Sequence, residues 1–185
     1  MQATLLDRLL LLAAAVLFST GGTAIKATNL TGWQVASFRS GVGALALLAL
    51  SGEARRGWSW RVLPVAVAYA ATLVLFVMAN KLTTAANAIF LQDAAPLYLV
   101  LLGPLLLRER ARKAELVLLA VVALGVALFF VAEETPVQTA PDPLAGNVLA
   151  VIAGLTWALT IAGLRWLGSS HGASVANAPV VGNLL

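Results

Sequence analysis

The chain has 185 residues, of which 61% are hydrophobic and 11% charged, and its formal net charge is +4. Soluble domains contain about 25% charged residues, and a chain of this length has too much surface to bury so much apolar material in one core. The composition therefore excludes a soluble globular domain and indicates a membrane protein. The chain has no cysteine, which excludes disulfide bonds and thiol chemistry. The basic residues are dispersed between apolar segments, so we expect no nucleic-acid partner.

Apolar segments long enough to cross a lipid bilayer follow one another along the chain, since a spanning helix needs about 20 residues. We expect a first helix that is retained rather than cleaved as a signal peptide, because Asp7 stands beside Arg8 and further spans follow. The expected fold class is an all-α polytopic transmembrane helix bundle. Its six predicted spans cover residues 9–25, 32–50, 62–80, 82–107, 114–132 and 144–164, and a seventh begins near residue 173.

The lysines and arginines predict an orientation for these spans. If the N-terminus is cytoplasmic, two basic residues fall in the outer loops, Lys26 and Lys81, and nine fall on the cytoplasmic side. The nine are Arg8, Arg55, Arg56, Arg61, Arg108, Arg110, Arg112, Lys113 and Arg165. This asymmetry follows the positive-inside rule, so we predict a multi-pass protein of the cell membrane with a cytoplasmic N-terminus.

The first and sixth predicted spans resemble each other, with LAAAVLFSTGGTAIK in the first and VIAGLTWALTIAGLR in the sixth, so that Phe18 aligns with Trp157. Five spans precede the sixth, so the two similar helices have opposite orientations, as in an inverted-topology repeat. Chance similarity between two spans rich in alanine, leucine and glycine is the alternative. We divide the chain into a first repeat at 1–132, an acidic extracytoplasmic linker at 133–143, and the start of a second repeat at 144–185.

Two charged side chains fall inside predicted spans, where a charge costs at least ~2.5 kcal/mol. Arg39 is expected about 9 Å below the outer interface, and Asp93 near the midplane. Arg39 suits a contact with an anionic group of a substrate, although it also has the length to snorkel to the outer headgroups. Asp93 is a candidate proton carrier, because apolar surroundings disfavour an unpaired carboxylate. The two residues could also form an ion pair, either one that substrate or a proton disrupts or a permanent structural one.

Weaker candidates for substrate contact are Gln92, beside Asp93, and the hydroxyls of Ser19 and Thr20 in the first span. The glycine pair at 21–22 permits either local unwinding at a site or close helix packing, and packing is the commoner explanation.

Two prolines in the fourth span, Pro96 and Pro104, remove backbone hydrogen bonds, so we expect a kink about one turn after Asp93. No zinc-protease motif or phosphate-binding loop occurs, and the single histidine, His171, makes a catalytic triad or a histidine metal site improbable. We therefore expect no enzyme activity, no cofactor and no metal.

The stretch TTAANAIFLQDAAPLYLVLLGPLLLRERARKAELVLLAVVALGVALFFV, at 83–131, resembles the EamA-like family of the drug/metabolite transporter superfamily. The matching features are the small polar start of the fourth span, Pro96, the helix end Leu-Arg-Glu-Arg and a glycine near Gly125. Arg39, within SFRSGVGALALL, matches a basic position common in that family.

The resemblance implies ten helices in two inverted five-helix repeats, with a substrate cavity between them, and the movement of small organic metabolites across cell membranes, often outward. Arg39 and Glu109 are carried over as pattern positions, and Asp93 falls near a place where relatives have an acidic or small residue before the proline. Ten helices need more than this length, so we expect either a fragment or a chain whose second half is supplied elsewhere, for example by a homodimer.

These observations together predict a secondary transporter that works by alternating access. Its expected substrate is a small organic metabolite, such as an amino acid or a drug-like or related compound, and efflux is the expected direction. The alternative is a non-transporting membrane scaffold or the partner subunit of a half-transporter.

Overall fold

The computed structural model describes residues 5–56, 58–103, 112–131, 135–169 and 175–185. In these ranges the chain is almost entirely helical, and six helical segments are long and apolar enough to cross a membrane. The multispanning all-α architecture expected from the sequence is confirmed. The helices are α1 (Leu5–Ala27), α2 (Gly32–Leu50), the short 3-10 helix η1 (Glu53–Arg55), α3 (Val62–Leu82), α4 (Ala85–Gln92), α5 (Ala95–Leu102), α6 (Lys113–Val131), α7 (Pro143–Ser169) and α8 (Asn177–Leu184).

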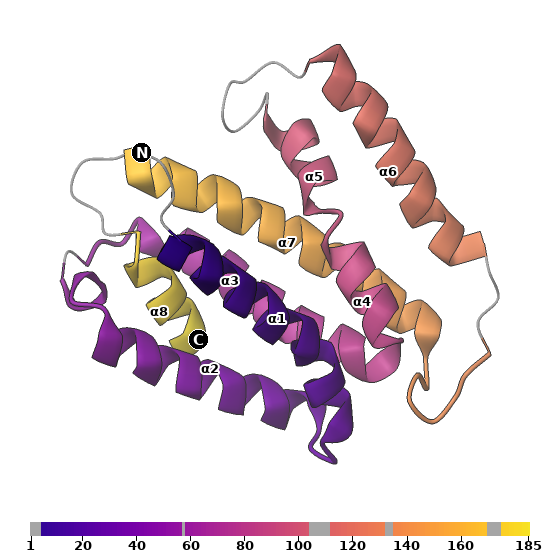
Figure 1. The fold of residues 1–185 in the computed structure, drawn as a ribbon, viewed down its shortest axis with the longest axis horizontal. Helices are drawn as coiled ribbons and strands as arrows, with labels where there is room; N and C mark the ends of the chain where they lie inside the picture. The colour runs from indigo at the N-terminus through magenta and orange to yellow at the C-terminus, as the bar shows by residue number, and fades with distance from the viewer. Residues whose placement is uncertain (1–4, 57, 104–111, 132–134, 170–174) are drawn as a thin grey trace.

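α3 is the central helix of the bundle. α7 packs along it more extensively than any other helix does, and α1, α2 and α8 contact its other faces (Figure 1). The close approach of α7 depends on small residues along its contact face. A Cβ at Gly163 would come within 2.7 Å of the Val65 side chain, and one at Gly146 within 2.5 Å of the Thr83 amide nitrogen. Small residues let helix backbones approach closely where lipid supplies no hydrophobic driving force between helices.

Hydrogen bonds that join helix ends to neighbouring loops define one end of the bundle, which we call the lysine end. The ammonium group of Lys26 donates to the carbonyl oxygens of Thr83 (2.7 Å) and Thr139. Lys81 donates to the carbonyl oxygen of Thr28 at 2.8 Å, and the amide of Asp142 donates to the Leu82 carbonyl at 3.1 Å. The C-terminal ends of α1 and α3 therefore meet the N-terminal ends of α2, α4 and α7 there.

The opposite end, which we call the arginine end, carries the loop between α2 and α3. Asn177, at the start of α8, donates to the Arg56 carbonyl at 2.8 Å. Leu167, near the end of α7, packs in one cluster with Val62 at the start of α3, which places Arg165 at this end as well. Successive spans thus run in alternate directions, as the charge pattern required.

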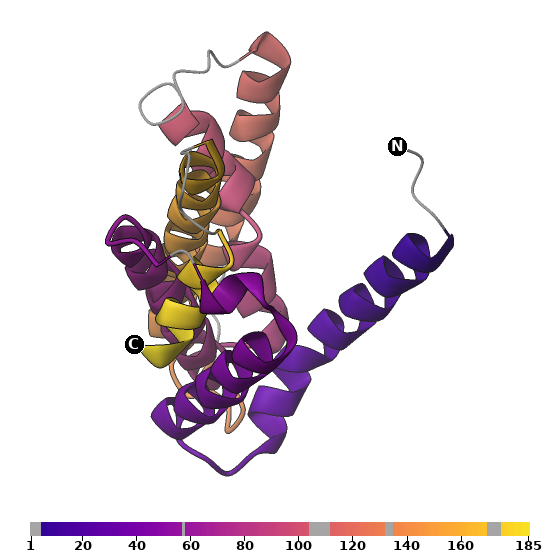
Figure 2. The same ribbon diagram turned by 90° about the vertical axis from the view of Figure 1, so that its left-hand side faces the viewer.

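α1 and α6 lie at the periphery. The N-terminal half of α1 leans away from the other helices (Figure 2), and α1 packs through Gly22 and Ile25 near its C-terminal end. No residue of α6 is buried. Most side chains of both helices are thus left for lipid or for further protein to cover.

Several sequence predictions fall on residues outside the described ranges, namely Pro104, the helix end around Glu109, the first residues of the acidic linker and His171. The described part of the linker makes a short turn closed by a bridge between Val137 and Ala140. α8 has eight residues, too few to cross a bilayer. The division of the chain into repeats stays a prediction.

Candidate functional site

The fourth span is broken in its middle. α4 ends at Gln92, Asp93 and Ala94 form a turn, and α5 begins at Ala95. The Asp93 amide donates to the Ile89 carbonyl at 2.9 Å and closes α4. The sequence predicted a kink one turn after Asp93, but the break lies at Asp93 itself. Its cause is Pro96, which has no N–H to donate to the carbonyl four residues earlier, that of Gln92.

α7 packs against the broken end of α4 through a glycine. A Cβ at Gly154 would lie 3.0 Å from the carbonyl oxygen of Gln92 and 3.1 Å from that of Leu91. The last carbonyls of α4 therefore face the backbone of a neighbouring helix, rather than bulky side chains. This arrangement agrees with the rule that interrupted helices in membranes are tolerated where the irregular backbone is covered by protein.

The two polar side chains at the break differ in their surroundings. The Oε1 atom of Gln92 is buried and has no hydrogen-bond partner, whereas the Asp93 side chain is exposed. A buried acceptor without a partner costs about 1–3 kcal/mol. The break thus combines an acceptor that lacks a donor with a carboxylate that can hold a proton or face a cation.

Arg39 lies against α3. Its guanidinium carbon is 5.9 Å from the centroid of the Phe76 ring, within the range of a cation–π interaction. Within the described residues Arg39 and Asp93 form no ion pair. α2 packs on α3 and α8, whereas α4 packs on α7, α1 and α3. The predicted pairing considered only depth along the span, whereas α2 and α4 share α3 as a neighbour and are not packed on each other in the described structure.

A polar and aromatic stripe on α3 was missed by the sequence reasoning. Spacings of three and four residues place Tyr69, Thr72, Phe76 and Asn80 on one face of the helix. The contacts of this stripe reach four other helices. Thr72 donates to the Thr156 hydroxyl on α7 at 2.9 Å. Tyr69 accepts from Asn183 on α8 at 3.5 Å, Phe76 meets Arg39 on α2, and Asn80 lies beside Gly22 on α1. The polar residues of this apolar span recur with the period of a helix, and this spacing could have revealed the stripe from the sequence.

Asn80 has a second unpartnered buried acceptor. Its side chain is fully buried, Nδ2 donates to the Phe76 carbonyl at 3.0 Å, and Oδ1 has no partner. A Cβ at Gly22 would lie 3.0 Å from this Oδ1 and 3.1 Å from the Ala85 Cβ. α1 stays helical through the glycine pair, so Gly22 serves close packing of α1 against α3 and α4.

Ser19 and Thr20 lie about one turn further along α1 toward its N-terminus. Both side chains are exposed. Their hydroxyls donate back to their own helix, Ser19 to the Val16 carbonyl at 2.8 Å and Thr20 to the Leu17 carbonyl at 2.9 Å. The structure brings Gln92 and Asp93 together at the break, and it leaves Ser19 and Thr20 without a contact to them.

A buried cluster of polar side chains ties α4 to α7 near the lysine end. The Thr83 hydroxyl donates to Asn147 Oδ1 at 2.7 Å. Asn87 Nδ2 donates to the same oxygen at 3.3 Å and to the Thr83 hydroxyl at 3.4 Å. Asn87 therefore has the interhelical bonding role expected of an amide in a span. Across the described ranges no group of three His, Asp or Glu side chains is arranged to hold a metal ion.

Comparison with known proteins gives one match. The model of the EamA-like transporter family matches residues 7–131, which cover α1 to α6. No curated protein and no solved structure matches the chain.

Proposed function

Because the chain belongs to the EamA-like transporter family of the drug/metabolite transporter superfamily, we propose that it moves a small organic metabolite across the cell membrane. The proposed mechanism is secondary transport by alternating access, with efflux as the direction. We further propose that residues 1–132 are one five-span repeat, that 133–143 link it to a second, and that the second begins at 144–185.

The observation that carries this proposal is the break in the fourth span. Transporters of several folds bind substrates and coupling ions near the bilayer midplane, where a spanning helix is interrupted. Here the interruption coincides with a carboxylate, Asp93, and with the unpartnered acceptor of Gln92. A ligand that donates a hydrogen bond would satisfy the buried Oε1 atom and so gain affinity from a group the protein leaves unpaired.

We assign a role to each predicted site residue. Asp93 carries the coupling proton, and Gln92 accepts a hydrogen bond from the substrate. Arg39, held over the Phe76 ring, faces the anionic group of the substrate. Ser19 and Thr20 contribute hydroxyls when α1 closes on the bundle. None of these roles requires a cofactor.

The test is a growth-protection screen. Cells that express the full-length protein are exposed to a panel of toxic amino acids, amino-acid analogues and drug-like compounds, beside cells that express Asp93→Asn or Asp93→Glu. We expect wild-type protein to protect against at least one compound and Asp93→Asn to reduce protection at least tenfold. Everted membrane vesicles should then take up that compound in a pH-dependent way with wild-type protein and in a pH-independent way with Asp93→Asn.

Two outcomes count against the proposal. If both Asp93 variants transport normally at every pH, Asp93 is not the proton site. If wild-type protein protects against nothing on the panel, and vesicles that contain it accumulate none of the compounds, the alternative of a non-transporting scaffold or partner subunit is favoured.

A further inference from the structure

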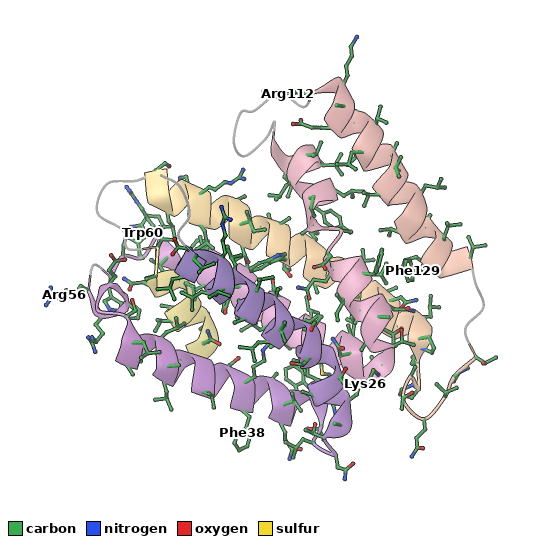
Figure 3. The ribbon with its side chains drawn as sticks, in the orientation of Figure 1. Lys26, Phe38, Arg56, Trp60, Arg112 and Phe129 are labelled. Carbon is green, nitrogen blue, oxygen red and sulfur yellow. The ribbon has the colours of Figure 1, made fainter. Side chains whose placement is uncertain are left out.

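The loop between α2 and α3, at the arginine end of the bundle, is rich in arginine and tryptophan, and Figure 3 labels Arg56 and Trp60 there. We call this set the basic rim, and it comprises Arg55, Arg56, Trp58, Trp60 and Arg61. All five side chains are exposed, Trp58 to 52% and Trp60 to 79%. Tryptophan is enriched at membrane–water interfaces, where its ring sits at the level of the lipid headgroups.

The cations at the two ends of the bundle differ in what they bind. At the lysine end, Lys26 and Lys81 both donate to backbone carbonyls of the chain itself. In the basic rim, Arg55 donates through Nη1 to the Leu48 carbonyl at 3.1 Å. Arg56 and Arg61 have no side-chain partner among the described residues. The rim therefore keeps guanidinium groups available for an external anion.

The backbone under the rim is held in place. Ala54 is fully buried, and its amide donates to the Ser51 hydroxyl at 3.2 Å. The Arg56 carbonyl accepts from Asn177 of α8, which packs against η1. The backbone that carries Arg55 and Arg56 is thus held by hydrogen bonds and packing, which lowers the entropy lost when an anion binds.

The charge balance favours an anionic partner. This segment contains three arginines and one acidic residue, Glu53. No rim arginine forms an ion pair with Glu53 in the described structure. Guanidinium groups bind phosphate oxygens in pairs, with better geometry than ammonium groups. From these observations we infer that the basic rim binds the phosphate headgroups of anionic phospholipids, with its tryptophans inserted at the headgroup level.

The inference is independent of transport and is tested by heat stability. The full-length protein in a neutral detergent is titrated with short-chain phosphatidylglycerol, short-chain phosphatidylcholine or inorganic phosphate, and its unfolding temperature is measured. We expect phosphatidylglycerol to raise the unfolding temperature and the other two probes to leave it unchanged. Arg55→Gln/Arg56→Gln/Arg61→Gln should need at least tenfold more phosphatidylglycerol for the same rise, because each lost charge-assisted bond between a guanidinium group and a phosphate weakens binding roughly tenfold.

Two further variants separate the rim from general charge and from folding. Arg56→Gln/Arg61→Gln keeps the Arg55 bond to α2 and should still need several-fold more lipid. The control Arg8→Gln/Arg112→Gln/Lys113→Gln removes the same number of exposed charges elsewhere and should respond as wild type does.

The inference is overturned if phosphatidylcholine stabilises as well as phosphatidylglycerol, or if both rim variants respond like wild type. It is equally overturned if the control variant loses the response to the same extent, since that result would indicate general attraction by net charge. A rise with inorganic phosphate alone would identify a site for free anions in place of a lipid site.

Discussion

Two amide side chains on α4, five residues apart, have opposite surroundings. Asn87 is buried and donates to Thr83 and Asn147, so it contributes to the packing of α4 on α7. Gln92 has a buried oxygen with no partner, so its amide costs stability where it stands. A buried polar group that destabilises the fold is a candidate for a functional role, because proteins keep such unfavourable groups mainly at functional sites.

At the residue scale, exchange of each amide for leucine separates these two roles. Gln92→Leu should leave the unfolding temperature unchanged or raise it, because it removes an unpartnered acceptor worth about 1–3 kcal/mol, and it should abolish transport of the compound found by the screen. Asn87→Leu should lower stability by roughly 1–2 kcal/mol, since its bonds to Thr83 and Asn147 are lost. Thermal unfolding in detergent measures both effects. A clear fall in stability for Gln92→Leu would show that its oxygen has a partner and contradict the assignment.

The bounds of the helices were predicted from the sequence more accurately than the contacts between helices. α2 occupies the predicted 32–50, and α3 extends the predicted 62–80 by two residues. The break at Asp93 was misplaced by a turn, because the missing bond of a proline acts four residues before it. The structure shows no ion pair between Arg39 and Asp93 among the described residues. The sequence left this pair open, because hydropathy gives the depth of a residue in the bilayer and not the helix that it faces. The α3 stripe was missed for the same reason, since its partners come from four different helices.

At the element scale, the broken end of α4 depends on Gly154 of α7. Gly154→Ala would place a methyl group 3.0–3.1 Å from two backbone oxygens, so α7 must move away from α4, at a cost of about 1–3 kcal/mol. The matched control is Gly125→Ala in α6, where a Cβ meets nothing within 4 Å, and a gain of about 0.5–1 kcal/mol is expected from better helix propensity. Thermal unfolding of both variants checks the difference. Equal unfolding temperatures for the two variants would mean that α7 does not pack closely against the broken end of α4.

At the scale of the whole molecule, the cationic side chains at the two ends of the bundle differ in their hydrogen bonding. The lysine end uses its two cations to tie loops together, while the arginine end keeps several guanidinium groups exposed. The prediction that the arginine end is cytoplasmic rests on the number of lysines and arginines in its loops, because short loops rich in these residues are retained inside.

The cysteine-free sequence offers a direct test of that orientation, since any cysteine introduced is the only one in these 185 residues. Asn29→Cys labels the exposed loop at the lysine end, and Gly52→Cys labels the arginine end, where a Cβ would meet only the Arg55 side chain at 3.9 Å. A membrane-impermeant maleimide applied to intact cells should modify Asn29→Cys and should reach Gly52→Cys only after permeabilisation. The reverse pattern would place the N-terminus outside and contradict the predicted orientation.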